Sequence, residues 1–265
     1  MAEEQQSEAE LPPLKIDETE RIIARLEQVV RDRRVVLVGG QAVAIWAAKL
    51  EDRIADTLVD AVASRDIDLL GNSSDLRQSA ALLNARVRVA TFEDRTPLTG
   101  VAIFLDSDGH ERRLDVMASV YGMNSEDIRQ TAIEAELLID GDRQVHVWVM
   151  HPERCMESRV HNSVLSNKQT DLAWRQLRAS ILCARAFSQL LLDARGAAAV
   201  RDVLKLNERI FHFAQEDRCT RLALHRNIET FDAVLDDERL PARFRTVRLP
   251  QMQNRIRTLR ERPSS

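Results

Sequence analysis

Hydrophobic and polar residues alternate along this chain with two different periods. Over residues 17–30 the apolar residues recur every three to four positions, which is typical of a helix with one buried face. A capping-box pair, Asp17 and Glu20, marks the start of this helix. The run VVLVGG then predicts a short strand and a tight turn, and QAVAIWAAKL predicts a second helix.

Strand and helix patterns continue to alternate up to residue 150. RDIDLL predicts a strand, and a helix capped by Ser73 or Ser74 follows it. RVRVATF has the period of a half-buried strand, and GVAIFLDSDGHERRLDVMAS predicts a hairpin that turns at Asp108-Gly109. A helix over Glu126–Leu138 and a strand over QVHVWVM complete this half.

From His151 onward the pattern is that of amphipathic helices, the first of which begins at Pro152. Later helices are marked by apolar residues at helical spacing: Leu177, Ile181, Ala184, Val203, Leu206, Ile210 and Phe213. We therefore predict an α+β fold class, in which a mixed-sheet domain over residues 17–150 precedes an all-α helical domain over residues 151–265. Residues 1–16 are expected to form a disordered acidic N-terminus.

Composition indicates a soluble protein with a hydrophobic core. Of the 265 residues, 44% are hydrophobic, yet no run approaches the roughly 20 consecutive apolar residues of a membrane span. The acidic, polar N-terminus does not resemble a secretory signal, so we expect a cytoplasmic location and no membrane partner. The three cysteines, Cys155, Cys183 and Cys219, are widely spaced, which favours reduced core thiols over disulfides or zinc.

Positive charge is concentrated near the C-terminus. The net charge is −4, but residues 239–262 contain eight arginines and the single acid Glu261. Such a segment is typical of a surface that binds a polyanion such as RNA. An ordinary solvated helix face in an arginine-rich protein explains the same pattern, and both interpretations remain open.

The stretch SRDIDLLG contains two aspartates, Asp66 and Asp68, in a predicted buried strand. Side chains two residues apart on a strand point to the same face, whereas Ile67 and Leu69 point into apolar packing. Asp115, in RRLDVM, lies on the second arm of the predicted hairpin. If that arm packs beside the strand that carries Asp66 and Asp68, three carboxylates meet on one face of the sheet. Like charges this close need a cation between them, and hard oxygen ligands of this kind favour two Mg²⁺ ions.

A glycine pair, Gly39-Gly40, lies between a predicted strand and a predicted helix. A turn without side chains lets a phosphate approach the backbone N–H groups at the start of the helix. Two glycines in such a turn are more often only a tight turn, and no Walker or dinucleotide-binding spacing is present. The pair therefore acquires meaning only together with the aspartates.

Together, LVGGQAVAIW, SRDIDLLG and RLDVM resemble the nucleotidyltransferase superfamily with the polymerase-beta-type fold. The closest resemblance is to the AbiEii-like nucleotidyltransferases, which include toxins of abortive-infection and toxin–antitoxin systems. The resemblance implies that Asp66, Asp68 and Asp115 bind Mg²⁺ or Mn²⁺ and carry catalysis. It also implies that Gly39 and Gly40 contact the nucleotide triphosphate. Gln41, Arg65 and, in the helical half, Lys168 are further candidate nucleotide-binding residues. Arg159 and Arg175 are further candidate phosphate partners, but an ordinary surface or interdomain role is favoured for both of them and for Lys168.

The activity implied by this resemblance is transfer of an NMP group from an NTP to a hydroxyl, with release of pyrophosphate. The first candidate acceptor is RNA, such as a tRNA 3′ end, the second is a protein side chain, and the third is a small molecule. A cognate antitoxin is a candidate partner protein. The alternative is a catalytically degenerate protein that binds a nucleotide, RNA or a partner. Gly40 favours this alternative, because many superfamily members have serine there. Sugar-nucleotide glycosyltransferases also have an Asp-x-Asp metal motif. This class is disfavoured, because a Gly-Gly turn and a helix shortly before the aspartates fit the nucleotidyltransferase arrangement better.

Overall fold

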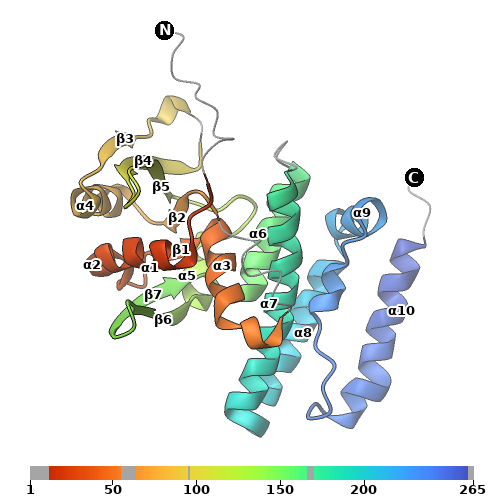
Figure 1. Ribbon diagram of the computed structural model, residues 1–265. Helices are drawn as coiled ribbons and strands as arrows, with labels where there is room; N and C mark the ends of the chain where they lie inside the picture. The colour runs from red at the N-terminus through yellow and green to blue at the C-terminus, as the bar shows by residue number, and fades with distance from the viewer. Residues whose placement is uncertain (1–11, 55–63, 95, 166–169, 262–265) are drawn as a thin grey trace. The chain divides into compact units, whose positions relative to one another are not determined.

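The computed structural model describes residues 12–54, 64–94, 96–165 and 170–261. Within these ranges seven strands form one mixed sheet in the order β3-β4-β5-β2-β1-β7-β6 (Figure 1). The strands are β1 (Val36–Val38), β2 (Ile67–Leu70), β3 (Arg86–Val89), β4 (Leu98–Leu105), β5 (Glu111–Met117), β6 (Ile133–Ile139) and β7 (Arg143–Val149). The pairs β1/β7 and β2/β5 are parallel, and the other pairs are antiparallel. With the helices that follow, this confirms the predicted α+β class.

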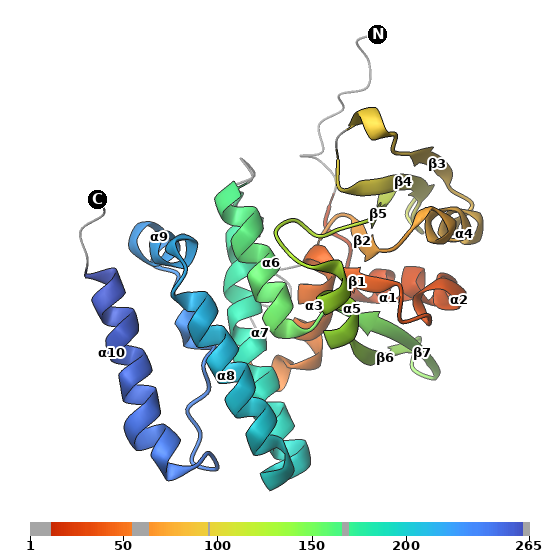
Figure 2. The ribbon, with the colours of Figure 1, turned by 180° about the vertical axis from the view of Figure 1, so that it is seen from behind.

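The described residues divide into two compact units, which we describe separately. The sheet unit comprises residues 12–45 and 64–151, and the helical unit comprises residues 46–54 and the described residues from Pro152 on. In the sheet unit, α4 packs on β4, α1 on β6 and α2 on β7 (Figure 2). The helices are α1 (Ile16–Arg25), α2 (Glu27–Val30), α3 (Gly39–Lys49), α4 (Ser73–Leu83) and α5 (Ser125–Thr131). Helix α3 spans both units, because its last turn belongs to the helical unit.

The predicted helix over Glu126–Leu138 is wrong in its second half. Helix α5 ends at Thr131, and β6 begins at Ile133 and pairs with β7 as an antiparallel hairpin. Side chains of β6 alternate between buried and exposed, which is the period of a strand. The turn of this hairpin contains Gly141 at φ +90°, a conformation that glycine adopts without strain.

Several predicted details of the other elements also need correction. Helix α1 begins after Lys15 without a side-chain cap, so Asp17 and Glu20 form no capping box, and a break at Leu26 separates α1 from α2. The cap of α4 is Asn72, whose side chain accepts from the backbone of Ser74 and Asp75, one residue before the predicted caps. Strand β3, at one edge of the sheet, is exposed along its whole length and not half-buried as its pattern predicted.

Residues 12–16, which fall in the segment expected to be disordered, are held in place. Leu14 is 1% exposed, and its N–H donates to the carbonyl of Ser64 at 2.9 Å. The carbonyl of Pro12 accepts a hydrogen bond from Arg112 at 2.6 Å. These contacts join the start of the described chain to Ser64, just before β2, and to Arg112 on β5.

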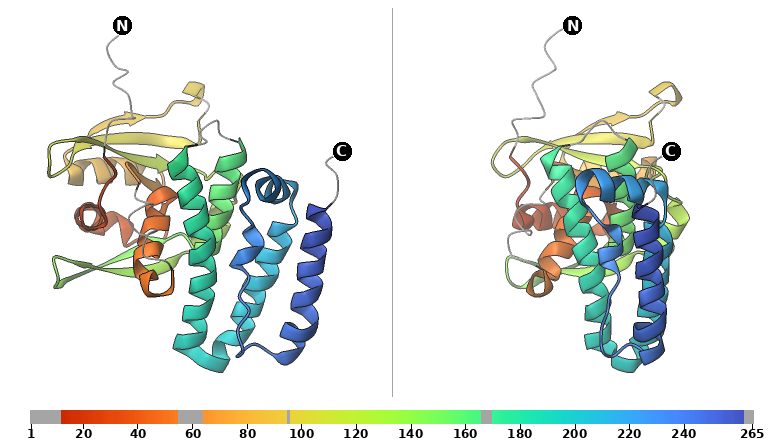
Figure 3. Two further views of the ribbon diagram at one scale, coloured as in Figure 1. Left: turned by 45° about the vertical axis from the view of Figure 1, so that its right-hand side comes forward. Right: turned by 90° about the vertical axis from the view of Figure 1, so that its right-hand side faces the viewer.

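The helical unit contains five helices among its described residues: α6 (Pro152–Leu165), α7 (Asp171–Arg195), α8 (Val200–Ala214), α9 (Asp217–Arg226) and α10 (Leu249–Arg260). They lie side by side around one apolar core that includes most of the residues predicted at helical spacing (Figure 3). Buried Asn207 of α8 fixes the loop that follows α9, since its amide both donates to and accepts from the Leu235 backbone at 2.9 Å. All three cysteines are buried thiols, as predicted. None of the described helices is long and apolar enough to cross a membrane.

Candidate active site

The glycine turn lies directly against one of the aspartates. Gly39 follows β1 and begins α3 with φ +70°, and Val38 is the register partner of Asp68 on β2. A Cβ atom on Gly39 would lie only 1.8 Å from Oδ2 of Asp68. The missing side chain therefore lets the N-terminus of α3 approach the Asp68 carboxylate far more closely than any other residue would allow.

The sheet places a second aspartate next to the first. Strands β2 and β5 are parallel neighbours, and Asp68 pairs in register with Asp115. Neighbouring strands lie about 4.8 Å apart, so the two half-buried carboxylates project side by side from one face. On the opposite face Ile67 and Leu114 are fully buried, as the alternating pattern predicted. Strand β2 is also an interior strand, between β1 and β5, as predicted.

Asp66 and Arg65 precede β2 in a bend, and both are half-buried. Among the residues that the structure describes, no group of three or more His, Cys, Asp or Glu side chains is close enough to hold a metal ion. The register thus joins Asp68 with Asp115, and a three-carboxylate site that includes Asp66 stays a prediction.

An arginine that the sequence did not single out lies beside this pair. Nη2 of Arg113 is 3.3 Å from Oδ1 and 3.4 Å from Oδ2 of Asp115. The two residues are two positions apart on β5 and therefore point to the same face. The side chain of Arg113 is 36% exposed and that of Asp115 is 16% exposed. The period-2 pattern of RRLD could have identified Arg113 as a neighbour of the carboxylate.

Gln41, an expected nucleotide-binding residue, is 1% exposed. Its Nε2 donates to the carbonyl of Ser64 at 3.0 Å, so its side chain ties the first turn of α3 to the residues just before Asp66. The Gln41 side chain therefore positions the site, while Gly39 and Gly40 offer the backbone N–H groups of the first turn.

The other expected phosphate partners belong to the helical part of the chain. Lys168 lies outside the described residues. Arg159 donates to Oε1 of Gln176 at 3.1 Å, and Arg175 donates to the carbonyl of Asp171 at 3.4 Å. Both arginines therefore have structural contacts within their own unit.

Several arginines of the C-terminal segment form ion pairs within the protein. Arg248 contacts Glu208 at 2.6 Å, and Arg260 contacts Glu229 at 3.0 Å. Arg239 contacts two carboxylates, one of them 2.7 Å away. These pairs leave less positive charge for a polyanion than the count of eight arginines suggests.

The carboxylate pair fits a divalent metal ion. Mg²⁺ in nucleotide-dependent enzymes is held by one or two protein carboxylates together with substrate phosphates and water. Asp68 and Asp115 supply such a pair, and the nearby start of α3 offers N–H groups to phosphate oxygens. The arrangement therefore provides the types of group that a metal–nucleotide complex requires.

No protein-family model matches the sequence, and no curated protein matches it. The solved structures with a loosely similar fold include an antigenic nucleotidyltransferase-like protein from Paracoccidioides brasiliensis, the antibiotic-resistance factor ANT(2'')-Ia and the Megavirus polyadenylate synthase. They are 15%, 15% and 12% identical to this chain, with TM-scores of 0.42, 0.39 and 0.40. The matches cover 74%, 73% and 98% of this chain, and 94%, 97% and 52% of theirs. Structural similarities at this level do not support an inference about activity, so the activity must be inferred from the geometry of the site.

Proposed function

We propose that this chain is a nucleotidyltransferase that moves an NMP group from an NTP to a hydroxyl acceptor. The proposal depends above all on one observation, the register of Asp68 with Asp115 beside the Gly39 turn. Two carboxylates and a helix N-terminus at one place suit a triphosphate with its metal ion better than they suit a neutral ligand. The sequence resemblance to the nucleotidyltransferase superfamily agrees with this geometry.

Mg²⁺ or Mn²⁺, when bound by Asp68 and Asp115, would neutralise charge that develops on the phosphate oxygens. The chain itself would orient the triphosphate through the backbone N–H groups of Gly39 and Gly40. The acceptor oxygen attacks the α-phosphorus, the bond from that phosphorus to the β-bridging oxygen breaks, and pyrophosphate leaves. Asp115 would accept the proton of the attacking hydroxyl.

RNA, such as tRNA, is the acceptor class we favour, with a protein side chain second. The side chains of Arg243 and Arg255 are exposed, and neither forms a hydrogen bond or ion pair with another described residue, so part of the C-terminal segment can meet phosphates. A role as a toxin controlled by an antitoxin protein follows from the AbiEii-like resemblance alone.

A second candidate is a nucleotide- or RNA-binding protein without catalysis. The contact between Arg113 and Asp115 favours it, because an arginine can neutralise a half-buried carboxylate without a metal ion. Transfer activity and its dependence on the carboxylates distinguish the two candidates.

The test is incubation of the purified protein with each labelled NTP, Mg²⁺ or Mn²⁺, and total tRNA. The variants are Asp68→Asn and Asp115→Asn, and the matched control is Asp142→Asn in the exposed turn between β6 and β7. Label that enters RNA or the protein with the wild type and the control, but not with the site variants, supports a transferase. Metal-independent nucleotide binding without transfer to RNA, protein or added small hydroxyl compounds would support the binding protein instead.

A further inference from the structure

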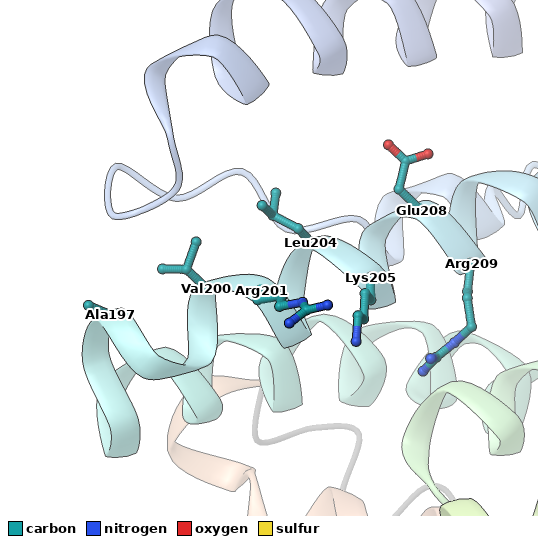
Figure 4. Close-up of a pocket in the computed structure, with 7 residues that line it drawn as sticks. All are labelled: Ala197, Val200, Arg201, Leu204, Lys205, Glu208 and Arg209. Atoms are coloured by element: carbon teal, nitrogen blue, oxygen red, sulfur yellow. The ribbon is translucent and has the colours of Figure 1, made fainter.

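A shallow, open surface groove of about 670 Å³ lies along the exposed side of α8 in the helical unit (Figure 4). Its lining comes from one continuous stretch of chain, namely Ala197, Val200, Arg201, Leu204, Lys205, Glu208 and Arg209. All these residues lie on α8 or on the helical turn before it, so the groove is formed by a helix surface and not by a loop.

The charged side chains of this groove differ in whether they are neutralised within the protein. Glu208 pairs with Arg248 at 2.6 Å, and Arg209 pairs with buried Glu153 at 2.6 Å. By contrast, the side chains of Arg201 and Lys205 are exposed, and neither side chain forms a hydrogen bond or ion pair with another described residue.

Arg201 and Lys205 are four residues apart, so they are neighbours on the helix surface, about 6 Å from each other. The adjacent acid, Asp202, is itself paired with Arg195 at 3.0 Å. The groove thus carries two positive charges that no described carboxylate compensates.

An apolar row lies beside this cationic row. Val200 and Leu204 are also four residues apart, and both are half-buried against the core of the unit, with Ala197 one turn before them. In Figure 4 the side chains of Val200, Leu204 and Glu208 extend to one side of α8, and those of Arg201, Lys205 and Arg209 extend to the other. The surface between the rows is therefore apolar on one flank and positive on the other.

We propose that this groove binds an amphipathic acidic helix of a partner protein. A helix whose leucines and glutamates both recur every four residues matches the two rows of α8 in spacing and in charge. A small molecule fits less well, because it would stay largely exposed on an open helix face, whereas small-molecule pockets bury most of their ligand. A nucleic acid also fits less well, since the groove offers it few cations and an apolar flank. The proposal is independent of the nucleotidyltransferase activity.

The test uses a fluorescein-labelled helical peptide with leucine and glutamate rows at i, i+4 spacing, and a second peptide with lysine in place of each glutamate. Fluorescence anisotropy with the full-length protein should show binding of the glutamate peptide that weakens at higher ionic strength. The double variant Arg201→Glu/Lys205→Glu should bind this peptide at least tenfold more weakly. The matched control, Arg221→Glu/Arg255→Glu, reverses two exposed charges elsewhere in the unit and should bind as the wild type does.

Leu204→Ser should also weaken binding, and circular dichroism checks that this half-buried position still permits folding. The charge-reversal variant keeps the test decisive if Leu204→Ser does not fold. Equal binding of the glutamate and lysine peptides would overturn the proposal, as would equal losses in the groove and control variants. An RNA oligonucleotide that binds through Arg201 and Lys205, where the glutamate peptide does not bind, would overturn it in favour of a polyanion site.

Discussion

Replacing Gly39 with alanine should disrupt the site through two separable costs. At φ +70° an L-residue carries a backbone penalty of about 1–2 kcal/mol. The new Cβ atom would also lie 1.8 Å from Oδ2, 2.7 Å from Cγ and 2.8 Å from Cβ of Asp68, so the Asp68 side chain must move. Overpacking of this kind typically adds about 1–3 kcal/mol. We therefore expect Gly39→Ala to lower the free energy of unfolding by about 2–5 kcal/mol.

Gly109 provides a matched control for the backbone term. It has φ +81° in the hairpin turn between β4 and β5, and a Cβ atom there would meet nothing within 4 Å. Gly109→Ala should thus cost only the backbone penalty, about 1–2 kcal/mol. Urea denaturation of both variants, followed by circular dichroism, measures the difference that the contact with Asp68 causes.

A double variant checks that Asp68 is the group responsible. Adding Asp68→Ala to Gly39→Ala removes the two closest atoms, Oδ2 and Cγ, and should recover part of the lost stability, so the two effects should not be additive. Equal destabilisation by Gly39→Ala and Gly109→Ala, or strict additivity in the double variant, would refute the close approach on which the site is built.

Three further predictions concern groups near the site and in the core. Arg112 is 3% exposed and lies 2.7 Å from buried Asp106, so Arg112→Met should cost about 3–5 kcal/mol in urea denaturation. Burial raises the pKa of Asp106, but hydrogen bonds from Arg112 and from the His110 and Asp108 backbone outweigh it and lower the pKa overall. The Arg112–Asp106 pair therefore stabilises the fold fully above the unfolded-state pKa of Asp106, and this stabilisation should be lost as the pH falls below about 4. A difference in unfolding free energy between Arg112→Met and the wild type that persists in acid would contradict this. Burial raises the pKa of the Cys183 and Cys219 thiols to about 12 and also raises the pKa of Cys155. A thiol reagent should therefore modify the three cysteines only in denaturant, and rapid labelling of the native protein would refute this. Arg113→Gln removes a cation beside Asp115, so calorimetry should show tighter Mn²⁺ binding in the absence of nucleotide, and weaker binding would show that Arg113 supports the metal site.

Local sequence patterns correctly predicted those elements whose structure depends mainly on residues close to one another in the chain. The hairpin turns at Gly109, where φ is +81°, because an Asp-Gly pair suits a tight turn in any context. Leu114 and Val116 are fully buried while Asp115 between them is not, as a period of two requires. The helical half likewise follows its apolar spacing.

The segment after Thr131 shows where local pattern fails. Its residues include Glu136 and Leu137, which are good helix formers, so local propensity at these positions favours a helix. The strand forms because β7 offers a full row of backbone partners from Ile133 to Ile139. Pairing of this kind is a tertiary interaction that overrides local helix propensity. The Asp-Gly pair at 140–141, a dipeptide typical of hairpin turns, was a usable sequence signal for the β6–β7 hairpin.

The sequence by itself determined the α+β class, the presence of aspartates on two strands and the glycine turn, because periodicity and turn chemistry act over a few residues. Only the tertiary structure decided that Asp68 and Asp115 are register partners, since they are far apart in the chain and strand register is a long-range property. It also decided which charges remain available: Arg113 contacts Asp115 and Arg248 contacts Glu208, whereas Arg201 and Lys205 have no compensating carboxylate among the described residues. A charge is neutralised by whatever lies within a few ångströms of it, and folding brings those neighbours together.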